Sequence, residues 1–211
     1  MKVSKAQAQA NRARVVETAS QLFRERGYDG VGVADLMAAA GFTHGGFYKQ
    51  FGSKTDLIAE STACGIARTV ALTGNGMDAA EFVRQYLSRE HRDGRGNGCT
   101  LAALGGDAAR QPDEVRALFA AGIESLVAAM SPGRGAEGAP ETAHPSRAAT
   151  LNLLATAVGA LIMSRACPDD SPLAEDILMA CRDALLASLR PGHAPDAPDA
   201  ADVPDATAEG P

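Results

Sequence analysis

Apolar residues recur at helical spacing from the start of the chain onward. Between residues 5 and 26 they share one face: Ala8, Val15, Ala19, Leu22 and Phe23. Ser4 with Gln7 is typical of a capping box at the start of such a helix, and Gly27 is a common stop signal at its end. The pattern therefore predicts a first helix over residues 5–26.

Two short helices are predicted directly after it. The first of them, over residues 33–39, has apolar residues at positions i, i+3, i+4 and i+7, which are Val33, Leu36, Met37 and Ala40. Its N-cap is Gly32, a weaker capping residue than serine. The next begins at His44 after Thr43 as its N-cap, with Phe42 and Phe47 placed for a hydrophobic staple. It ends before Gly52, where Ser53 caps the following helix with Asp56 three residues on.

The stretch "AGF" at residues 40–42 predicts a tight turn between the two short helices. Short helices joined by a glycine-containing turn form a helix-turn-helix, whose second helix enters the major groove of DNA. Gly45 and Gly46 each cost about 1 kcal/mol of helix stability relative to alanine. Their presence indicates a close approach to phosphates, base edges or the partner helix. The alternative is that "GFYKQF" is an amphipathic helix with a solvated edge.

Helices are predicted over most of the remaining chain. Apolar spacing and capping residues place them near residues 54–73, 78–91, 100–110, 113–130, 147–166 and 172–189. The glycine-rich stretch at residues 92–98 predicts a connector and not a phosphate loop, because no strand precedes it and no G-K-[ST] follows. Two segments are predicted to be disordered: residues 131–145, which are rich in glycine and proline, and residues 194–211, which are acidic and rich in proline.

Composition favours an all-α protein. Of 211 residues, 45% are hydrophobic and only 4% aromatic, and there is no tryptophan. The formal net charge of −6 argues against a nucleic-acid partner until it is divided by region. Residues 1–60 hold eight Lys/Arg and six Asp/Glu, whereas the last 21 residues hold five acidic residues and no Lys or Arg. The acidic total therefore conceals a mildly basic N-terminal part.

Residues that carry catalytic or metal chemistry are sparse. Cys64, Cys99, Cys167 and Cys181 lie far apart, and the histidines do not fall at metal-ligand intervals, so we expect free thiols, no metal and no cofactor. No nucleophile, base and acid stand together, so we do not expect an enzyme. The uncharged run at residues 148–164 is shorter than the roughly 20 residues of a membrane span, and no leader sequence is seen. We expect a cytoplasmic protein without a membrane partner.

Residues 14–60, "RVVETASQLFRERGYDGVGVADLMAAAGFTHGGFYKQFGSKTDLIAE", resemble the N-terminal domain of the TetR family of bacterial transcriptional repressors. The aromatic pair, the turn glycine and the "F-x-S-K-x-x-L" ending carry the resemblance. It implies a homodimer that binds a palindromic operator on double-stranded DNA and releases it when a small molecule enters the C-terminal helical half. By position it implies DNA contacts from Thr43, His44, Gly45, Tyr48, Lys49, Gln50 and Lys54.

The chain departs from the family pattern at Val31 and Gly32, where Thr and Ser are usual. This departure puts in question the phosphate contact normally made at the start of the second helix.

The chemistry of the matched residues agrees with these positions. Lys49 and Lys54 can bind phosphates as point charges, and the Tyr48 hydroxyl can position the protein on the DNA. His44 is the candidate base reader, and the alternative is a solvated side chain. Helix N-termini add partial positive charge for the phosphates.

The last two helices hold more apolar surface than one small core would absorb, which predicts a dimer through a four-helix bundle. The candidate interface residues are Leu151, Leu154, Val158, Leu161, Ile177, Leu178, Cys181 and Leu185. The alternative is that the stripe on residues 172–189 faces the monomer's own core. The expected domains are 1–55 for DNA binding, with the helix-turn-helix at 32–51, then 56–190 for effector binding and dimerisation, and 191–211 as a disordered acidic tail.

The effector pocket is expected among the helices that follow the DNA-binding domain. Apolar candidates for its walls are Ile66, Val70, Phe82, Phe119, Leu126 and Leu154, which suggest a mostly apolar ligand. Cys99, where the glycine-rich loop meets a helix, is a candidate for a reactive thiol, and the alternative is a small buried hydrophobe. A second class of function is a helical ligand-binding protein or enzyme that retains a helix-turn-helix-like head.

Overall fold

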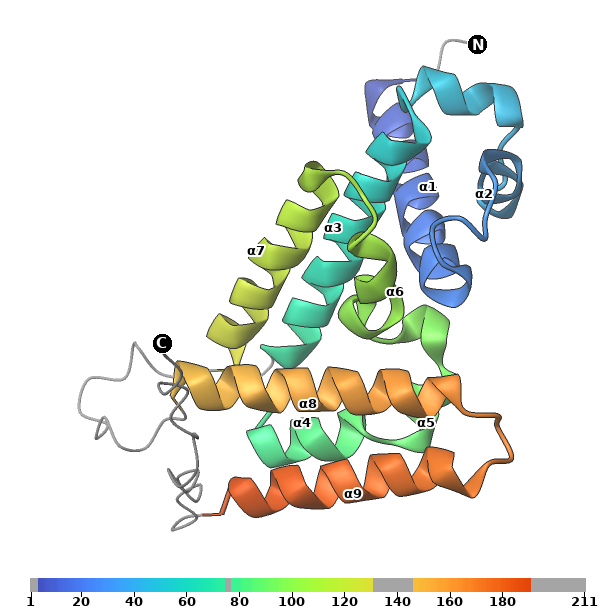
Figure 1. Ribbon diagram of the computed structural model, residues 1–211. Helices are drawn as coiled ribbons and strands as arrows, with labels where there is room; N and C mark the ends of the chain where they lie inside the picture. The colour runs from blue at the N-terminus through green and yellow to red at the C-terminus, as the bar shows by residue number, and fades with distance from the viewer. Residues whose placement is uncertain (1–3, 75–76, 131–145, 191–211) are drawn as a thin grey trace, which may run out of the picture.

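The computed structural model describes residues 4–74, 77–130 and 146–190, and these form helices without a β-strand, as the composition predicts. The segments predicted to be disordered, 131–145 and 194–211, lie outside the described residues. The elements (Figure 1) are α1 (Lys5–Arg26), α2 (Val33–Ala39), η1 (His44–Lys49), α3 (Lys54–Thr73), α4 (Ala79–Tyr86), α5 (Arg89–Asp93), η2 (Arg95–Asn97), α6 (Thr100–Ala108), α7 (Asp113–Ala129), α8 (Arg147–Ala166) and α9 (Pro172–Ser188).

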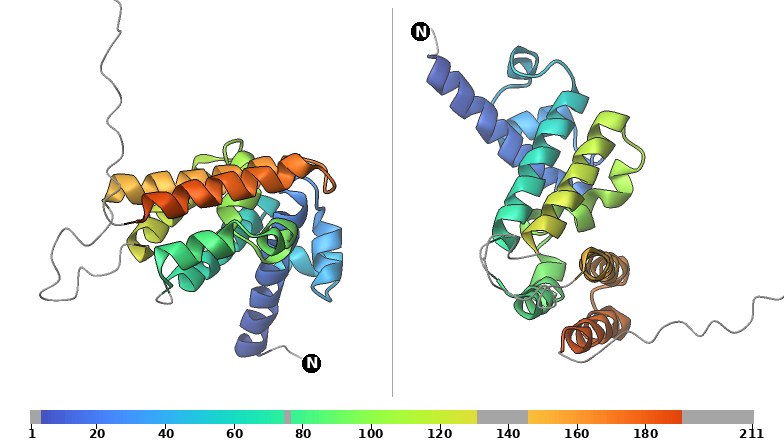
Figure 2. Two further views of the ribbon diagram at one scale, coloured as in Figure 1. Left: turned by 90° about the horizontal axis from the view of Figure 1, so that it is seen from below. Right: turned by 90° about the vertical axis from the view of Figure 1, so that its left-hand side faces the viewer.

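Helices α1, α2 and η1 form a small head at one end of the molecule (Figures 1 and 2). Its core consists of side chains with no exposed surface: Val15, Ala19, Phe23, Leu36, Met37 and Phe47. The turn between α2 and η1 requires glycine, because Gly41 has a φ of 83°. The head therefore has the layout of a helix-turn-helix unit, with η1 as its second helix.

The helix that begins at His44 is a 3₁₀-helix. Its hydrogen bonds join residues three apart, such as Gly46 N to Thr43 O at 2.9 Å and Gln50 N to Phe47 O at 2.8 Å. Thr43 holds the N-cap position, but its side chain makes no capping bond. Two adjacent glycines in six residues weaken the longer α-helical pattern, which explains the tighter form.

The two capping boxes predicted from the sequence have different outcomes. The Ser53–Asp56 capping box is present at the start of α3, with Ser53 Oγ accepting from Asp56 N and Asp56 Oδ2 accepting from Ser53 N, both at 3.1 Å. At α1 only half of the predicted box forms. Ser4 Oγ accepts from Gln7 N at 3.1 Å, while the Gln7 amide donates to Asn11 Oδ1 at 2.9 Å.

The larger helical unit is built on α3, which packs against α1 on one side and α7 on the other (Figure 1). The single helix predicted over residues 78–91 is instead two, α4 and α5. The break falls at Leu87, because Ser88 offers a new N-cap, its Oγ accepting from His91 N at 3.1 Å. The glycine-rich connector forms the single turn of η2, so residues 88–99 make a compact folded connection, called here the 88–99 segment.

Helices α8 and α9 lie side by side at the end of the molecule opposite the head (Figures 1 and 2). The stripe expected to face a partner packs mostly inside the chain. Leu161 and Leu178 have no exposed surface, and Leu154 and Leu185 are 5% exposed. This burial agrees with the alternative that the stripe faces the monomer's own core, and a dimer contact through these four residues stays a prediction, because an amphipathic stripe shows that a face is buried but not against which surface.

The other four candidates, Leu151, Val158, Ile177 and Cys181, are half-buried. The exposed apolar side chains of these two helices lie elsewhere, and they are Ile162, Met163, Leu173 and Met179, between 40% and 59% exposed.

Helix α8 is the one described helix long and apolar enough to cross a membrane by length and composition. It nevertheless behaves as a helix of a folded core, because it packs against α6, α7 and α9. Its polar residues agree with this, since Ser164 is fully buried and its hydroxyl donates to the carbonyl of Ala174 at 2.7 Å.

Candidate DNA-binding surface and ligand cavity

Helix η1 presents exposed polar side chains next to the buried rings of Phe47 and Phe51. Phe47 has no exposed surface and stacks on Phe51 with ring centroids 5.4 Å apart. Tyr48 is 68% exposed and meets the Phe47 ring edge-on at 5.2 Å. His44 meets Tyr48 edge-on at 6.1 Å, and Lys49 is exposed beside them. The hydroxyl, imidazole and ammonium groups thus stand together on one rigid turn.

The two glycines of η1 face different surroundings. A Cβ on Gly46 would lie 3.5 Å from Met37 Cε, so this glycine packs against α2. A Cβ on Gly45 would have no described atom within 4 Å, and Gly45 is exposed. A Cβ on Gly46 would make only ordinary van der Waals contacts with the partner helix, so packing does not require this glycine, and Gly45 leaves open space for an approaching molecule.

Gln50 and Lys54 are less free than the other residues that the resemblance assigns to DNA. Gln50 is half-buried, and its Nε2 donates to the Gly46 carbonyl at 3.4 Å. Lys54 Nζ donates to the carbonyl of Tyr28 at 2.6 Å, which joins the start of α3 to the turn after α1. Both side chains therefore have structural contacts within the head, while Thr43, His44, Gly45, Tyr48 and Lys49 are exposed.

Arg12 of α1 holds η1 in place, a role that the sequence analysis missed. Its guanidinium donates to the Gln50 carbonyl and to the Glu60 carboxylate, and it lies 4.2 Å from the centroid of the Phe51 ring. Its partners are 38 and 48 residues away in the chain. Local spacing carries no signal for contacts of that range.

The start of α2 contains the two residues at which the sequence departs from the family pattern. Val31 is 1% exposed and belongs to the core, and Gly32 provides no side-chain cap. The first amides of α2 are therefore left without a side-chain acceptor from their N-cap residue.

The larger cavity, about 850 Å³, lies between α3, α4 and the 88–99 segment. Phe82 and Cys99, two of the predicted pocket residues, line it. A second cavity of about 480 Å³ between α6, α7 and α8 is lined by Phe119 and Leu154. The predicted wall residues thus divide between two cavities.

The remaining predicted wall residues line neither cavity. Ile66 and Leu126 are buried in the core at 6% and 1% exposure, and Val70 is half-buried.

His91 stands in the wall of the larger cavity as a neutral imidazole. Nδ1 donates to the Tyr86 carbonyl at 2.7 Å, and Nε2 accepts from Cys99 N at 3.1 Å. Only the neutral ring satisfies both bonds, and burial lowers the pKa of His91. Burial raises the pKa of the neighbouring Tyr86 well above its ordinary value, and its hydroxyl has no hydrogen-bond partner within the described chain.

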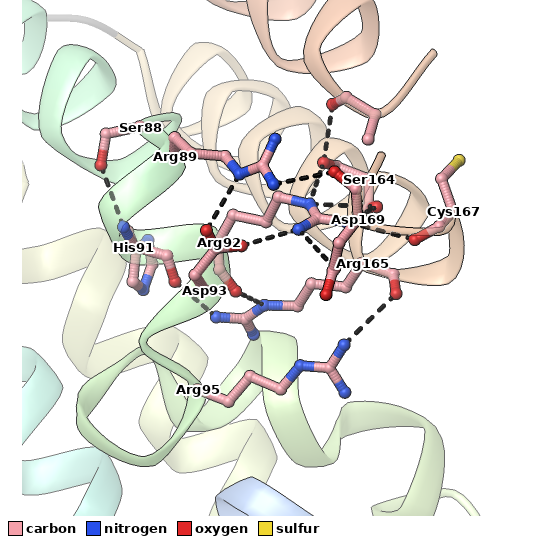
Figure 3. A network of polar contacts seen from close by, with 11 residues as sticks. Ser88, Arg89, His91, Arg92, Asp93, Arg95, Ser164, Arg165, Cys167 and Asp169 are labelled. Atoms are coloured by element: carbon pink, nitrogen blue, oxygen red, sulfur yellow. Dashed lines mark hydrogen bonds and ion pairs between the residues drawn. The ribbon is translucent and has the colours of Figure 1, made fainter. Parts of the chain in front are cut away.

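The buried Arg92 and the half-buried Arg165 attach the 88–99 segment to α8 and to the turn that follows it (Figure 3). Arg92 is 2% exposed and donates to Ser164 Oγ at 3.0 Å, to the Cys167 carbonyl at 3.1 Å and to Asp169 at 3.0 Å. Arg165 donates in the opposite direction, to the carbonyls of His91 and Arg92 at 2.7 and 2.9 Å. The cavity wall is therefore held by charge-assisted hydrogen bonds.

Lowering the pH from about 7.5 to 5.5 should destabilise the fold through His91. Its native pKa lies below the ordinary value of about 6.5, so the unfolded chain binds more protons in this window. The stabilisation is full above pH 6.5 and is lost as the pH falls toward the native pKa. Urea unfolding at the two pH values should show this loss in the wild type and a smaller loss in His91→Gln. Equal losses would assign the dependence to another group.

The head matches the family model described as bacterial regulatory proteins, tetR family, over residues 15–60. An uncharacterized HTH-type transcriptional regulator of Mycobacterium tuberculosis is 28% identical over 197 residues, which cover 86% of this chain and 97% of that relative.

Two solved structures share the fold. The reduced form of E. coli NemR has a TM-score of 0.64 and 20% identity, covering 82% of this chain and 96% of that one. A TetR-family regulator from Agrobacterium tumefaciens has a TM-score of 0.61 and 23% identity, covering 85% and 97%. With the helix-turn-helix head and the helical C-terminal unit, these matches support one conclusion: the head is a DNA-binding domain of the tetR family of bacterial regulatory proteins, and the chain has the fold of TetR-family transcriptional regulators.

Proposed function

We propose that the protein is a homodimeric repressor that binds a palindromic operator through η1 and releases it when a small molecule occupies the C-terminal unit. The observation that carries the proposal is the surface of η1, where exposed His44, Tyr48 and Lys49 stand on the buried ring of Phe47. A regulator of chromosomal genes acts in the cytoplasm, which is the location we infer.

The roles at the DNA follow from the side chains. Lys49 neutralises a phosphate, Tyr48 fixes the register through its hydroxyl, and His44 reads a base edge. Gly45 allows the DNA backbone to approach, since the space beside it is open. Thr43, Gln50 and Lys54 complete the proposed contacts, the last two with less freedom because of their bonds within the head.

Dimerisation is supported by the outward side of α8 and α9. Small or apolar residues that are exposed or half-buried alternate there at spacings of four and three: Ala148, Asn152, Ala155, Gly159 and Ile162. This spacing suits close packing of two helices, and α9 adds the exposed Leu173 and Met179. A two-fold dimer places two heads side by side, so a palindromic operator follows from the symmetry.

The larger cavity is the proposed effector site. Its volume of about 850 Å³ suits a drug-sized molecule. Leu72 and Phe82 give it an apolar lining, while Arg84 and Glu81 place opposite charges beside each other at 3.8 Å. A small, mostly apolar ligand without a net charge fits this balance.

A thiol-reactive effector is the alternative mode of release. Cys99 is 4% exposed, lines the same cavity and is the N-cap residue of α6. A reagent that enters the cavity therefore reaches the thiol without crossing the core, and an adduct there occupies the effector space.

Removing the charge of Lys49 should weaken operator binding at every sequence. Lys49→Ala loses one phosphate contact, which lowers the salt slope of log K by about 1. The measurement is fluorescence anisotropy over a salt series with DNA fragments that flank the gene. Arg110→Ala, which removes an exposed charge beyond α6, is the matched control and should bind as wild type. An unchanged slope in Lys49→Ala would contradict the docking model.

A charge on the outward face of α8 should yield a folded monomer. Ile162→Asp places two carboxylates at the proposed two-fold interface, whereas Leu178→Asp buries a charge inside one chain and costs several kcal/mol of folding free energy. Sedimentation and circular dichroism should give a helical monomer for the first variant and an unfolded chain for the second. A folded Ile162→Asp dimer would rule out this interface.

Thiol chemistry should distinguish the two modes of release. If Cys99 is the sensor, a small methanethiosulfonate or hydrogen peroxide releases the operator from wild type and from Cys181→Ser, but not from Cys99→Ser. Gel shifts with mass spectrometry of the intact protein measure release and labelling together. Equal release from all three proteins, or no modification at Cys99, would leave the non-covalent ligand as the effector.

A further inference from the structure

Arg24, in the last turn of α1, attaches the head to the 88–99 segment. Its side chain is 5% exposed. Nε and Nη2 both donate to the carbonyl of Gly96, at 2.9 and 2.7 Å, and Nη1 donates to Ser20 Oγ at 2.7 Å. Two donors of one planar group therefore converge on a single carbonyl of η2.

The attachment is stiff because it holds a buried charge. Burial lowers the pKa of Arg24, yet a guanidinium stays protonated in proteins. The acceptors that it has in the described chain are neutral, a carbonyl and a hydroxyl. Losing the carbonyl would leave a buried cation with one partner, which costs more than an ordinary hydrogen bond. The Gly96 carbonyl consequently fixes η2 relative to α1.

The backbone of η2 lies directly on α1 at this point. A Cβ on Gly96 would overlap the carboxylate of Glu25 and lie 3.0 Å from its Cγ. Gly96 is buried, so a side chain there would displace the Glu25 carboxylate. The main chain of η2 therefore meets α1 through the side chains of Arg24 and Glu25, with no side chain from Gly96 between them.

The neighbours of Gly96 form one wall of the larger cavity. Gly94 on one side, and Asn97, Gly98 and Cys99 on the other, line it. A ligand that pushes this wall outward moves the carbonyl that Arg24 holds.

A second acceptor lies unused near Arg24. Thr100 Oγ1 has no hydrogen-bond partner among the described residues, and Thr100 is 1% exposed. A Cβ built on Gly65 would lie 2.5 Å from Thr100 Oγ1 and 2.7 Å from Arg24 Nη1, so the two groups converge on one point over α3. A small shift at the start of α6 gives the guanidinium a different acceptor set, as a two-state element requires.

We propose that Arg24 transmits occupation of the larger cavity to the DNA-binding head by exchanging the Gly96 carbonyl for the Thr100 hydroxyl. In the state described here, Gly96 holds α1 against η2. When a ligand displaces residues 94–99, the guanidinium turns to Thr100 and α1 changes its tilt. Arg24 is thus a positioning residue that touches neither ligand nor DNA, and the inference rests on the proposed function because its output is operator release.

Reciprocity allows a test without knowledge of the ligand. If the cavity wall and the head are coupled, operator binding must change the free energy of moving the wall. By linkage, this change equals the effect of the same wall movement on the free energy of operator binding. Hydrogen exchange of amides 94–102 should slow about fivefold or more when wild type binds the operator fragment. In Arg24→Met this slowing should be lost while the operator Kd stays within about threefold, since Arg24 makes no proposed DNA contact.

The matched control is Arg26→Met, an exposed arginine two residues on in the same helix, which should keep the slowing. Arg24→Lys retains the buried charge but offers one donor nitrogen, so it should keep part of the slowing. It serves as the test variant if Arg24→Met does not fold. A bound operator that leaves amides 94–102 unchanged in wild type overturns the proposal. Full slowing in Arg24→Met or Arg24→Lys overturns it equally.

A second measurement separates this proposal from DNA binding itself. Gly98→Ala disturbs the wall, because its Cβ would lie 2.9 Å from His91 Nε2 and 3.3 Å from Arg165 Nη2. In the free protein, Gly98→Ala should shift the NMR amide resonances of residues 20–24 when Arg24 is present. The same substitution in the Arg24→Met background should leave these resonances unchanged. Shifts of equal size in both backgrounds, or in neither, contradict the coupling even if no operator is found. Failure of wild type to bind any DNA contradicts the proposed function alone.

Discussion

The 88–99 segment is held to α1 and α8 by hydrogen bonds from buried and half-buried guanidinium groups to main-chain carbonyls. The 88–99 segment, "SREHRDGRGNGC", has a single apolar residue, Cys99, and so cannot fold by packing side chains into a core. Arg24 holds it from α1, and Arg92 and Arg165 join it to α8. Three charged groups with fixed donor geometry replace the contacts that a hydrophobic sequence would supply.

This arrangement explains why the same segment serves as cavity wall and as neighbour of the head. Hydrogen bonds to a planar group are directional, so small displacements break them, whereas apolar contacts slide and adapt. Gly96 and Gly98 bring the backbone to its partners without intervening side chains. In the proposed coupling, a movement of the wall reaches α1 through these bonds. The neutral His91 and the Tyr86 hydroxyl, which has no hydrogen-bond partner among the described residues, lie in that wall.

Apolar periodicity and capping residues predicted most of the fold. The bounds of α1, α2, α3 and α8 agree with the sequence, because Ser53, Gly27 and similar residues act locally. The 3₁₀ form of η1 and the break at Leu87 were missed, since each depends on competing short-range bonds. The exposed part of the proposed DNA-binding surface follows from helix position. The contacts of Arg12, Arg24 and Arg92 instead join residues 38 to 77 apart and leave no local pattern.

The two sides of the larger cavity differ in what they are made of. Helices α3 and α4 contribute side chains such as Leu72 and Phe82, while the 88–99 segment contributes glycines and main chain. Substitutions on the helices would alter which molecules fit, and they would leave the attachments of the opposite wall intact. With the larger cavity as the proposed effector site, ligand selectivity can diversify among descendants of this protein, or in a designed biosensor, while the proposed coupling through the 88–99 segment is kept.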